Sequence, residues 1–138
     1  MIFENAGLAP IVQSEDMEII STPFDFWGVN YYSRNLVRRE ESSILGTEVV
    51  QGELPKSEMS WEIYPEGLEA FLFRAYKEFG KKPIYVTENG IAGKDTLLDA
   101  SVDDYYRIEY LRQHSSAALN AIKGGVNLRR LFCLDFDG

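Results

Sequence analysis

A glutamate stands at the end of a short run of β-favouring residues, where its type and place suit bond-breaking chemistry. The run covers residues 84–87, and Glu88, Asn89 and Gly90 stop it in a turn. A carboxylate in this position can act as a nucleophile or as a general base. On spacing alone, the alternative is a glutamate that merely helps to end a strand.

Two further segments carry side chains that could line a site with Glu88. Residues 24–32 have the aromatic and β-favouring composition of a buried strand, in which Asn30 and Tyr32 share a face. Trp61 stands just before a predicted helix. The alternatives are a packed strand end whose polar atoms pair with the backbone and, for Trp61, an anchor in the hydrophobic core.

The elements that would position these residues alternate between strand and helix. Pro65 suits the first turn of a helix that Gly80 ends, and its apolar residues recur at helical spacing: Leu68, Phe71, Leu72, Ala75, Tyr76 and Phe79. A second helix is predicted with Ser101 as its N-cap and with Asp103 and Asp104 in its first turn, closed by Gly124 and Gly125. Its apolar stripe is Ile108, Leu111, Ala118, Leu119 and Ile122. With a third strand over residues 126–134, this order predicts an α/β fold with a parallel sheet.

The remaining segments are less regular. Residues 1–22 are predicted as loop with room for one helical turn, and residues 33–60 as a long polar connection of the kind that is usually functional or disordered. His114 is expected at or near the surface, and Cys133 as a small buried apolar residue.

The overall composition excludes several classes of protein. A net charge of −8 offers no basic surface for nucleic acid or anionic lipid, so neither nucleic acid nor a membrane is expected as a partner. Charges interrupt every apolar run before the roughly 18–20 residues that would span a bilayer. One cysteine and no leader-like start favour a reducing, cytoplasmic location.

Four segments, in the same order, resemble family 1 of the glycoside hydrolases. Residues 85–90 are similar to the family's Thr-Glu-Asn-Gly nucleophile motif, and residues 25–32 to its sixth strand. Residues 61–68 resemble the segment that enters the next helix, and residues 107–111 the helix after the nucleophile. The resemblance implies the C-terminal part of a (β/α)8 TIM barrel, about strands 6 to 8, as an incomplete barrel.

The resemblance also implies roles for single residues. Glu88 matches the catalytic nucleophile, and Tyr32 the tyrosine whose hydroxyl bonds to that nucleophile and stabilises its charged form. Asn30 matches a polar residue that lines the sugar pocket, and Trp61 an aromatic residue at the mouth of that pocket, where a sugar stacks. The expected partner is a β-glucoside or related sugar, and neither a metal nor a cofactor is expected.

The sequence departs from the family in two places. A retaining glycosidase needs two carboxyl groups about 5–5.5 Å apart, and the family's Asn-Glu-Pro acid/base motif has no counterpart in these 138 residues. Residues 129–138 diverge from the family's eighth strand. We therefore expect one partial domain over residues 1–138, with little or no activity alone. The alternatives are a half-barrel that associates with itself or with a complementary fragment through open sheet edges, and a sugar-binding module without catalysis.

Overall fold

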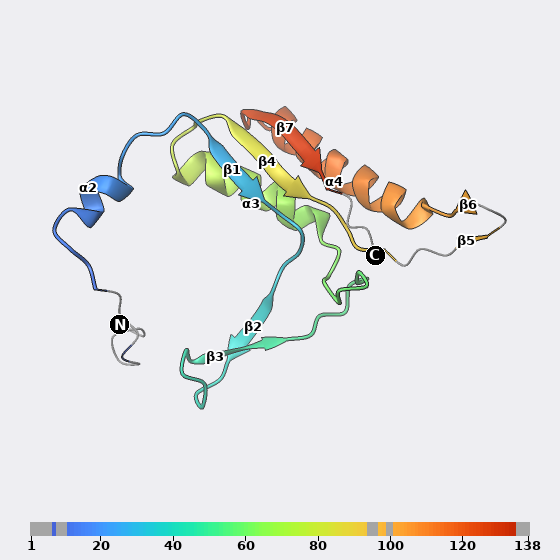
Figure 1. The fold of residues 1–138 in the computed structure, drawn as a ribbon, viewed down its shortest axis with the longest axis horizontal. Helices are drawn as coiled ribbons and strands as arrows, with labels where there is room; N and C mark the ends of the chain where they lie inside the picture. The colour runs from blue at the N-terminus through green and yellow to red at the C-terminus, as the bar shows by residue number, and fades with distance from the viewer. Residues whose placement is uncertain (1–6, 8–10, 94–96, 99–100, 135–138) are drawn as a thin grey trace. The chain divides into compact units, whose positions relative to one another are not determined.

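The computed structural model describes residues 7, 11–93, 97–98 and 101–134 (Figure 1). Contacts within the chain group into two compact units. The smaller unit consists of Met1–Phe24 and Asn35–Glu53, and the larger of Asp25–Arg34 and Leu54–Gly138. The expected single partial domain with a divergent tail over residues 129–138 stays a prediction.

The larger unit is built on a parallel sheet of three strands, β1 (Trp27–Asn30), β4 (Ile84–Asn89) and β7 (Leu128–Cys133). Strand β4 lies in the centre and pairs in parallel with both others. All three strands fall where the sequence predicts them, except that β4 continues through Glu88 and Asn89, which were expected to stop it in a turn. The parallel pairing confirms the predicted α/β class.

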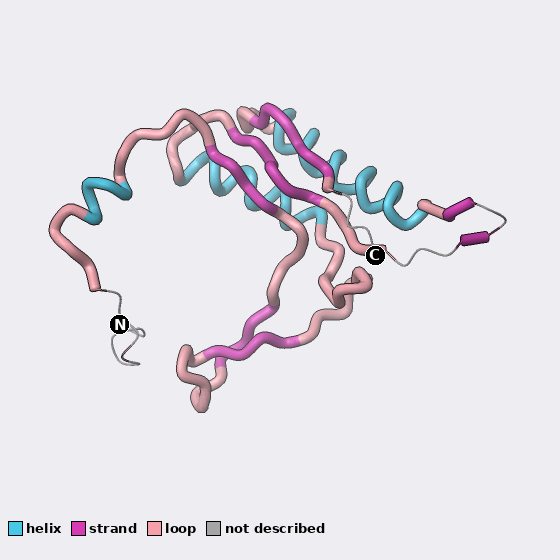
Figure 2. The backbone as a smooth tube through the Cα atoms, in the orientation of Figure 1, coloured by secondary structure: helices cyan, strands magenta, loops and turns pink. Residues whose placement is uncertain are grey.

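Helices α3 (Pro65–Glu78) and α4 (Tyr105–Lys123) connect these strands, and they contact each other beside the sheet (Figures 1 and 2). Proline opens α3 because it has no N–H to leave unsatisfied in the first turn. Gly124 caps α4, and Gly125 follows with a positive φ of 95° that favours glycine. The short strands β5 (Leu97–Leu98) and β6 (Ser101–Val102) form an antiparallel pair before α4. The prediction of Ser101 as the N-cap is therefore wrong, because Ser101 lies in β6 and Asp104 stands at the N-cap of α4.

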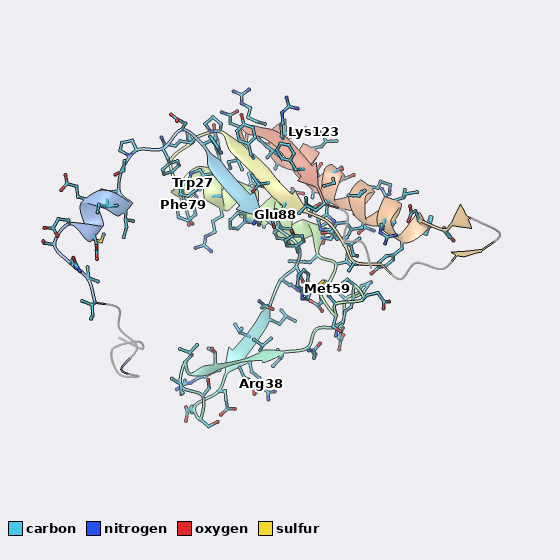
Figure 3. The ribbon with its side chains drawn as sticks, in the orientation of Figure 1. Trp27, Arg38, Met59, Phe79, Glu88 and Lys123 are labelled. Carbon is cyan, nitrogen blue, oxygen red and sulfur yellow. The ribbon has the colours of Figure 1, made fainter. Side chains whose placement is uncertain are left out.

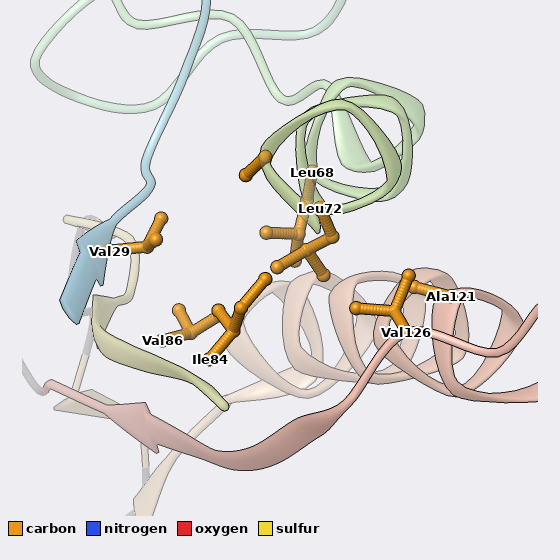
Figure 4. Close-up of a cluster of buried hydrophobic side chains, with 8 residues drawn as sticks. Val29, Leu68, Leu72, Ile84, Val86, Ala121 and Val126 are labelled. Carbon is orange, nitrogen blue, oxygen red and sulfur yellow. The ribbon is translucent and has the colours of Figure 1, made fainter. Parts of the chain in front are cut away.

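The core lies between the sheet and α3 (Figure 4). Leu68 and Leu72 of α3 are fully buried against Ile84 and Val86 of β4, with Val29, Ala75, Ala121 and Val126 completing the cluster. Each large aliphatic side chain buried in this way contributes about 1.5–3 kcal/mol. At the edge of the core, the Trp27 indole N–H donates to the Phe79 carbonyl oxygen at 3.2 Å, which ties the end of α3 to β1 (Figure 3).

An extra residue in β4 changes which side chains face the helices. Val29 and Asn30 of β1 pair with Val86 and Glu88, so Thr87 is inserted between two pairs. Ile84, Val86 and Asn89 are buried, which breaks the two-residue alternation of a regular strand. The bulge therefore turns Asn89, in place of Glu88, toward the helix layer.

The buried faces of the two helices differ from the predicted stripes. In α3, Leu68, Leu72 and Ala75 are buried as expected, but Phe71 and Phe79 are exposed. In α4, Ala118 is buried as expected, but Ile108, Leu119 and Ile122 are exposed, and the other buried residues are Tyr110, His114, Ala117 and Ala121. The prediction of a surface His114 is therefore wrong, because α4 packs through its small side chains, its tyrosine and its histidine. The prediction of a buried Cys133 is also wrong, since this side chain is exposed.

The smaller unit holds the five-residue helix α2 (Asp16–Ile20) and a hairpin of β2 (Leu36–Arg39) and β3 (Thr47–Val50). Helix α2 confirms the single helical turn predicted before residue 22. The hairpin corrects the prediction of an irregular connection over residues 33–60. Arg38 of β2 pairs with Glu48 directly opposite on β3, and Gly46 takes a positive φ of 68° in the turn.

Among the described residues, no helix is both long and apolar enough to cross a membrane.

Candidate active site

The carboxylate of Glu88 and the hydroxyl of Tyr32 meet at the carboxyl ends of β4 and β1. The Tyr32 hydroxyl donates to Glu88 Oε2 at 2.6 Å, and both residues are partly buried. Burial, together with the adjacent Glu88 carboxylate, raises the pKa of Tyr32 to about 12. At neutral pH the phenol therefore keeps its proton and acts as a donor to the carboxylate.

Asn30 lies beside this pair, but its described contact is with the neighbouring strand. Thr87 donates its hydroxyl to Asn30 Oδ1 at 2.7 Å, and the same hydroxyl lies 3.2 Å from the Val29 carbonyl oxygen. Asn30 is exposed. The bulge in β4 presents Thr87 to Asn30, so these two side chains bridge β1 and β4 next to Glu88.

Trp61 reaches the same place from a different segment of the larger unit. Its ring lies 5.6 Å from the Tyr32 ring, inclined by 53°, and 40% of the residue is exposed. That exposure argues against a core anchor, because a core tryptophan would bury most of its large surface. The exposed part of the indole is available as a flat apolar surface beside the carboxylate.

A buried ion pair holds the Trp61 segment against the chain that follows β1. Glu62 is 6% exposed, and its Oε2 accepts from Arg34 Nε at 2.7 Å. Its Oε1 accepts from the Leu54 N–H at 3.1 Å, and the Ser33 hydroxyl donates to the Glu62 carbonyl oxygen at 2.9 Å. The hydrogen bond with Arg34 lowers the pKa of Glu62, so the carboxylate stays charged.

The hollow behind these aromatic rings is too small for a sugar. A cavity of about 10 Å³ is lined by Tyr32, Trp61, Ile91 and their neighbours, which is room for about one water molecule. A ligand larger than a water molecule cannot enter this cavity and could contact only the exposed side of the rings.

The structure brings Glu88, Tyr32, Asn30 and Trp61 into one neighbourhood. Two further residues there were not singled out from the sequence: Asn89, which is fully buried, and Tyr110, which is 2% exposed. Both stand inside segments quoted for the family resemblance, but nothing in their spacing assigns them a task. Among the described residues, no group of three or more His, Cys, Asp or Glu side chains is placed to hold a metal ion.

Comparison with known sequences gives the same family. The model of glycosyl hydrolase family 1 matches residues 1–136. A 1,4-beta-D-glucan glucohydrolase from Thermotoga neapolitana is 40% identical over 119 residues, which are 86% of this chain and 28% of that protein. A 6-phospho-beta-galactosidase from Streptococcus equi subsp. zooepidemicus is 32% identical, over 96% of this chain and 33% of that protein.

Solved structures agree. A Thermotoga maritima family 1 glycoside hydrolase, complexed with a cyclophellitol analogue, superposes with a TM-score of 0.88 at 36% identity. The match covers 97% of this chain and 30% of that one, so the chain spans about a third or less of the length of these relatives. Since such relatives are TIM barrels, the three-stranded sheet with its two helices has the fold of part of such a barrel. Because the family model extends over nearly all of the sequence, the chain belongs to glycosyl hydrolase family 1.

Proposed function

We propose that this chain carries the nucleophile of a retaining β-glycosidase site, on about strands 6 to 8 of a (β/α)8 barrel. Glu88 attacks the anomeric carbon of a β-glucoside as the glycosidic C–O bond breaks, and forms a covalent glycosyl-enzyme. The leaving alcohol departs with a proton from the acid/base. Asn30 offers a polar contact to a sugar hydroxyl, and Trp61 stacks against the leaving group or the next sugar. The observation that carries this proposal is the 2.6 Å hydrogen bond from the Tyr32 hydroxyl to Glu88.

The bond supports a nucleophilic role for a physical reason. A carboxylate must remain charged and correctly turned in order to attack carbon, and a donor on one oxygen favours both. A glutamate that only helps to end a strand, without a catalytic role, needs no such donor. Because its pKa is raised to about 12, Tyr32 remains a neutral donor throughout the pH range in which glycosidases work.

The second carboxyl group of the proposed mechanism comes from outside this sequence, which contains no Asn-Glu-Pro segment. Without that acid/base, protonation of the leaving group is lost, which lowers the rate by about 10²–10⁴-fold. We therefore propose that this chain alone has little or no turnover, and that a reducing cytoplasmic setting suits its single cysteine.

A chimera tests the proposal. This chain replaces the matching segment of the Thermotoga maritima β-glucosidase, which then supplies the remaining strands and the acid/base. We expect the chimera to hydrolyse an aryl β-glucoside. Glu88→Gln should lower kcat/KM by about 10⁴-fold or more, which is the scale of losing a covalent nucleophile.

Glu66→Gln is the matched control, because Glu66 is an exposed carboxylate in the first turn of α3. It should leave kcat/KM within about twofold of the parent chimera, since surface substitutions away from the site have small effects. Full activity in Glu88→Gln would refute the assignment of the nucleophile. A chimera that binds glucose without hydrolysing any aryl glycoside would instead favour a sugar-binding module.

Association through the sheet edges is the second candidate function, and one observation favours it. Within the described residues, β1 and β7 each pair with β4 alone, so both leave one edge unpaired. Unpaired edges offer backbone N–H and C=O groups to another chain. The partner in this proposal is a second copy or a complementary barrel fragment.

A further inference from the structure

The buried amide of Asn89 links three segments of the larger unit. Asn89 is fully buried at the end of β4, and its Nδ2 donates to the Tyr31 carbonyl oxygen at 2.9 Å. The same nitrogen donates to the Tyr110 hydroxyl on α4 at 3.0 Å. A buried amide nitrogen is costly without partners. Its two partners lie on the chain after β1 and on α4, so these bonds tie the end of β4 to both segments.

Tyr110 extends the connection to the backbone of Tyr32. Its hydroxyl lies 3.4 Å from the Tyr32 carbonyl oxygen, to which it donates while it accepts from Asn89. The Tyr110 ring stacks on the His114 ring with centroids 3.8 Å apart and an interplanar angle of 25°. His114 Nδ1 in turn lies 2.9 Å from the Tyr110 carbonyl oxygen. The buried histidine therefore limits the movement of the tyrosine ring.

These contacts converge on a two-residue stretch of backbone. The Tyr31 N–H donates to the Glu88 carbonyl oxygen at 2.9 Å. Together with the bonds from Asn89 to Tyr31 and from Tyr110 to Tyr32, this fixes the chain just before the Tyr32 side chain leaves it. The Tyr32 hydroxyl lies several bonds further on, so a small rotation of this backbone would lengthen its 2.6 Å contact with Glu88.

We propose that Asn89 and Tyr110 are positioning residues, which hold the Tyr32 backbone so that its hydroxyl stays bonded to the Glu88 carboxylate. The catalytic meaning of this role rests on the proposed function, whereas the positioning itself rests on the geometry of the buried network. Neither side chain needs to touch the sugar. Each acts on the nucleophile through Tyr32.

The test reads the Tyr32–Glu88 bond directly and needs no turnover. The complete chain is labelled with ¹³Cζ-tyrosine, because the shift of this carbon responds to a hydrogen bond at the phenol oxygen. Tyr32→Phe identifies the Tyr32 resonance, and Glu88→Gln gives its position when the carboxylate is absent. We expect Tyr110→Phe to move the resonance at least half of the way to the Glu88→Gln position.

Tyr106→Phe is the matched control. It also removes a hydroxyl from α4, but the Tyr106 hydroxyl donates to the Lys56 carbonyl oxygen at 2.8 Å and not to Tyr32. It should leave the Tyr32 resonance in place. Asn89→Leu, which removes the donors at similar volume, is a second variant and should move the resonance in the same direction. Circular dichroism confirms that each variant retains its helices.

Folded Tyr110→Phe and Asn89→Leu variants with an unmoved Tyr32 resonance would overturn the proposal, whatever their stability, because a purely packing role predicts that result. In the chimera, Tyr110→Phe should lower kcat about tenfold with little change in KM. If Glu88→Gln leaves the chimera active while Tyr110→Phe still moves the resonance, the assignment of the nucleophile fails and the positioning network stands.

Discussion

At the residue scale, the candidate site is built on a contact between a neutral phenol and a carboxylate. Tyr32 donates to Glu88, and burial together with the bonded carboxylate raises the pKa of Tyr32 to about 12. A phenol that does not ionise near neutrality keeps its proton, so it remains available as a donor to the Glu88 carboxyl oxygen.

The ion pair of Glu62 and Arg34 leads to a prediction about acid stability. The hydrogen bond from Arg34 lowers the pKa of Glu62 from its ordinary 4.5. A group whose pKa is lower when folded contributes stability above its unfolded pKa and loses that contribution as pH falls through the folded value. We therefore expect the urea concentration at the unfolding midpoint to decrease as the pH is lowered below about 4.5. In Glu62→Gln this decrease should be less steep.

Arg34→Gln provides the partner variant for this prediction. Glu62→Gln and the double variant should show the same shallow dependence on pH, because neither contains the Glu62 carboxyl group. In Arg34→Gln the buried carboxyl group loses its cation, so its pKa should rise and it should no longer destabilise the folded chain in acid. Glu109, whose pKa is lowered to about 2 by Arg112 and Gln113, supplies a separate acid dependence that all variants retain. An equally steep decline in the parent and in Glu62→Gln would contradict the prediction.

At the residue scale, the sequence led to the site through resemblance more than through spacing. Glu88, Tyr32 and Trp61 were chosen because they stand in segments similar to a family, and the structure brings their side chains together. Asn89 was seen only as a neighbour of Glu88, since a regular strand gives no reason for it to be buried. The bulge at Thr87 gives that reason, and no pattern of residues predicts the bulge.

At the scale of elements, the existence of a helix was easier to predict than which of its sides is buried. The position of α4 follows from its helical composition and from Gly124, but its two sides are both partly apolar. Large side chains such as Leu119 and Ile122 suggested the wrong side. The buried side of α4 instead carries Ala117, Ala118 and Ala121, whose small size allows close approach to the sheet and α3.

The hairpin of β2 and β3 was missed for a different reason. Its turn has none of the short Asn-Gly or Asp-Gly signals that mark a two-residue hairpin. Its strands are four residues long, and charged residues such as Arg38 and Glu48 occupy them. Cross-strand pairing of opposite charges stabilises such a hairpin, and it becomes visible only when the register is known.

A glycine in the first turn of α3 gives a prediction at this scale. A methyl group on Gly67 would collide with the Tyr31 hydroxyl and with the Tyr64 ring. The Tyr31 hydroxyl is held there by donating to the Tyr64 carbonyl oxygen at 2.6 Å. Although alanine normally stabilises a helix relative to glycine, we expect Gly67→Ala to lower the free energy of unfolding by about 1–3 kcal/mol, as overpacking does.

Urea unfolding followed by circular dichroism at 222 nm measures this effect. Ala70→Gly serves as the control, since Ala70 is exposed on the same helix and its replacement should cost about 1 kcal/mol of helix propensity alone. A Gly67→Ala variant that is more stable than the parent would show that Tyr31 and Tyr64 can move aside freely.

On the scale of the whole molecule, the sheet has two edges that no other described strand pairs with, and these edges are not equivalent. Strand β7 carries Arg129 and Arg130, both exposed, and charges on an edge oppose pairing with another chain. Strand β1 has no charged residue between Trp27 and Asn30. Association of this chain with a second copy should therefore proceed through β1.

Two copies that pair through β1 would form a twofold, antiparallel contact, because the same edge is used by both. Since β1 is only four residues long, we expect a weak dimer, with a dissociation constant of about 10⁻⁵–10⁻⁴ M. Light scattering after size-exclusion chromatography should show a mass that rises from 15.7 kDa with concentration.

Gly28→Lys places a charge in the middle of β1 and should keep the chain monomeric. Ile44→Lys adds the same charge at an exposed position outside the sheet and should leave the dimer unchanged. A chain that stays monomeric at several hundred micromolar would exclude pairing through this edge, whereas equal loss of dimer in both lysine variants would attribute association to net charge.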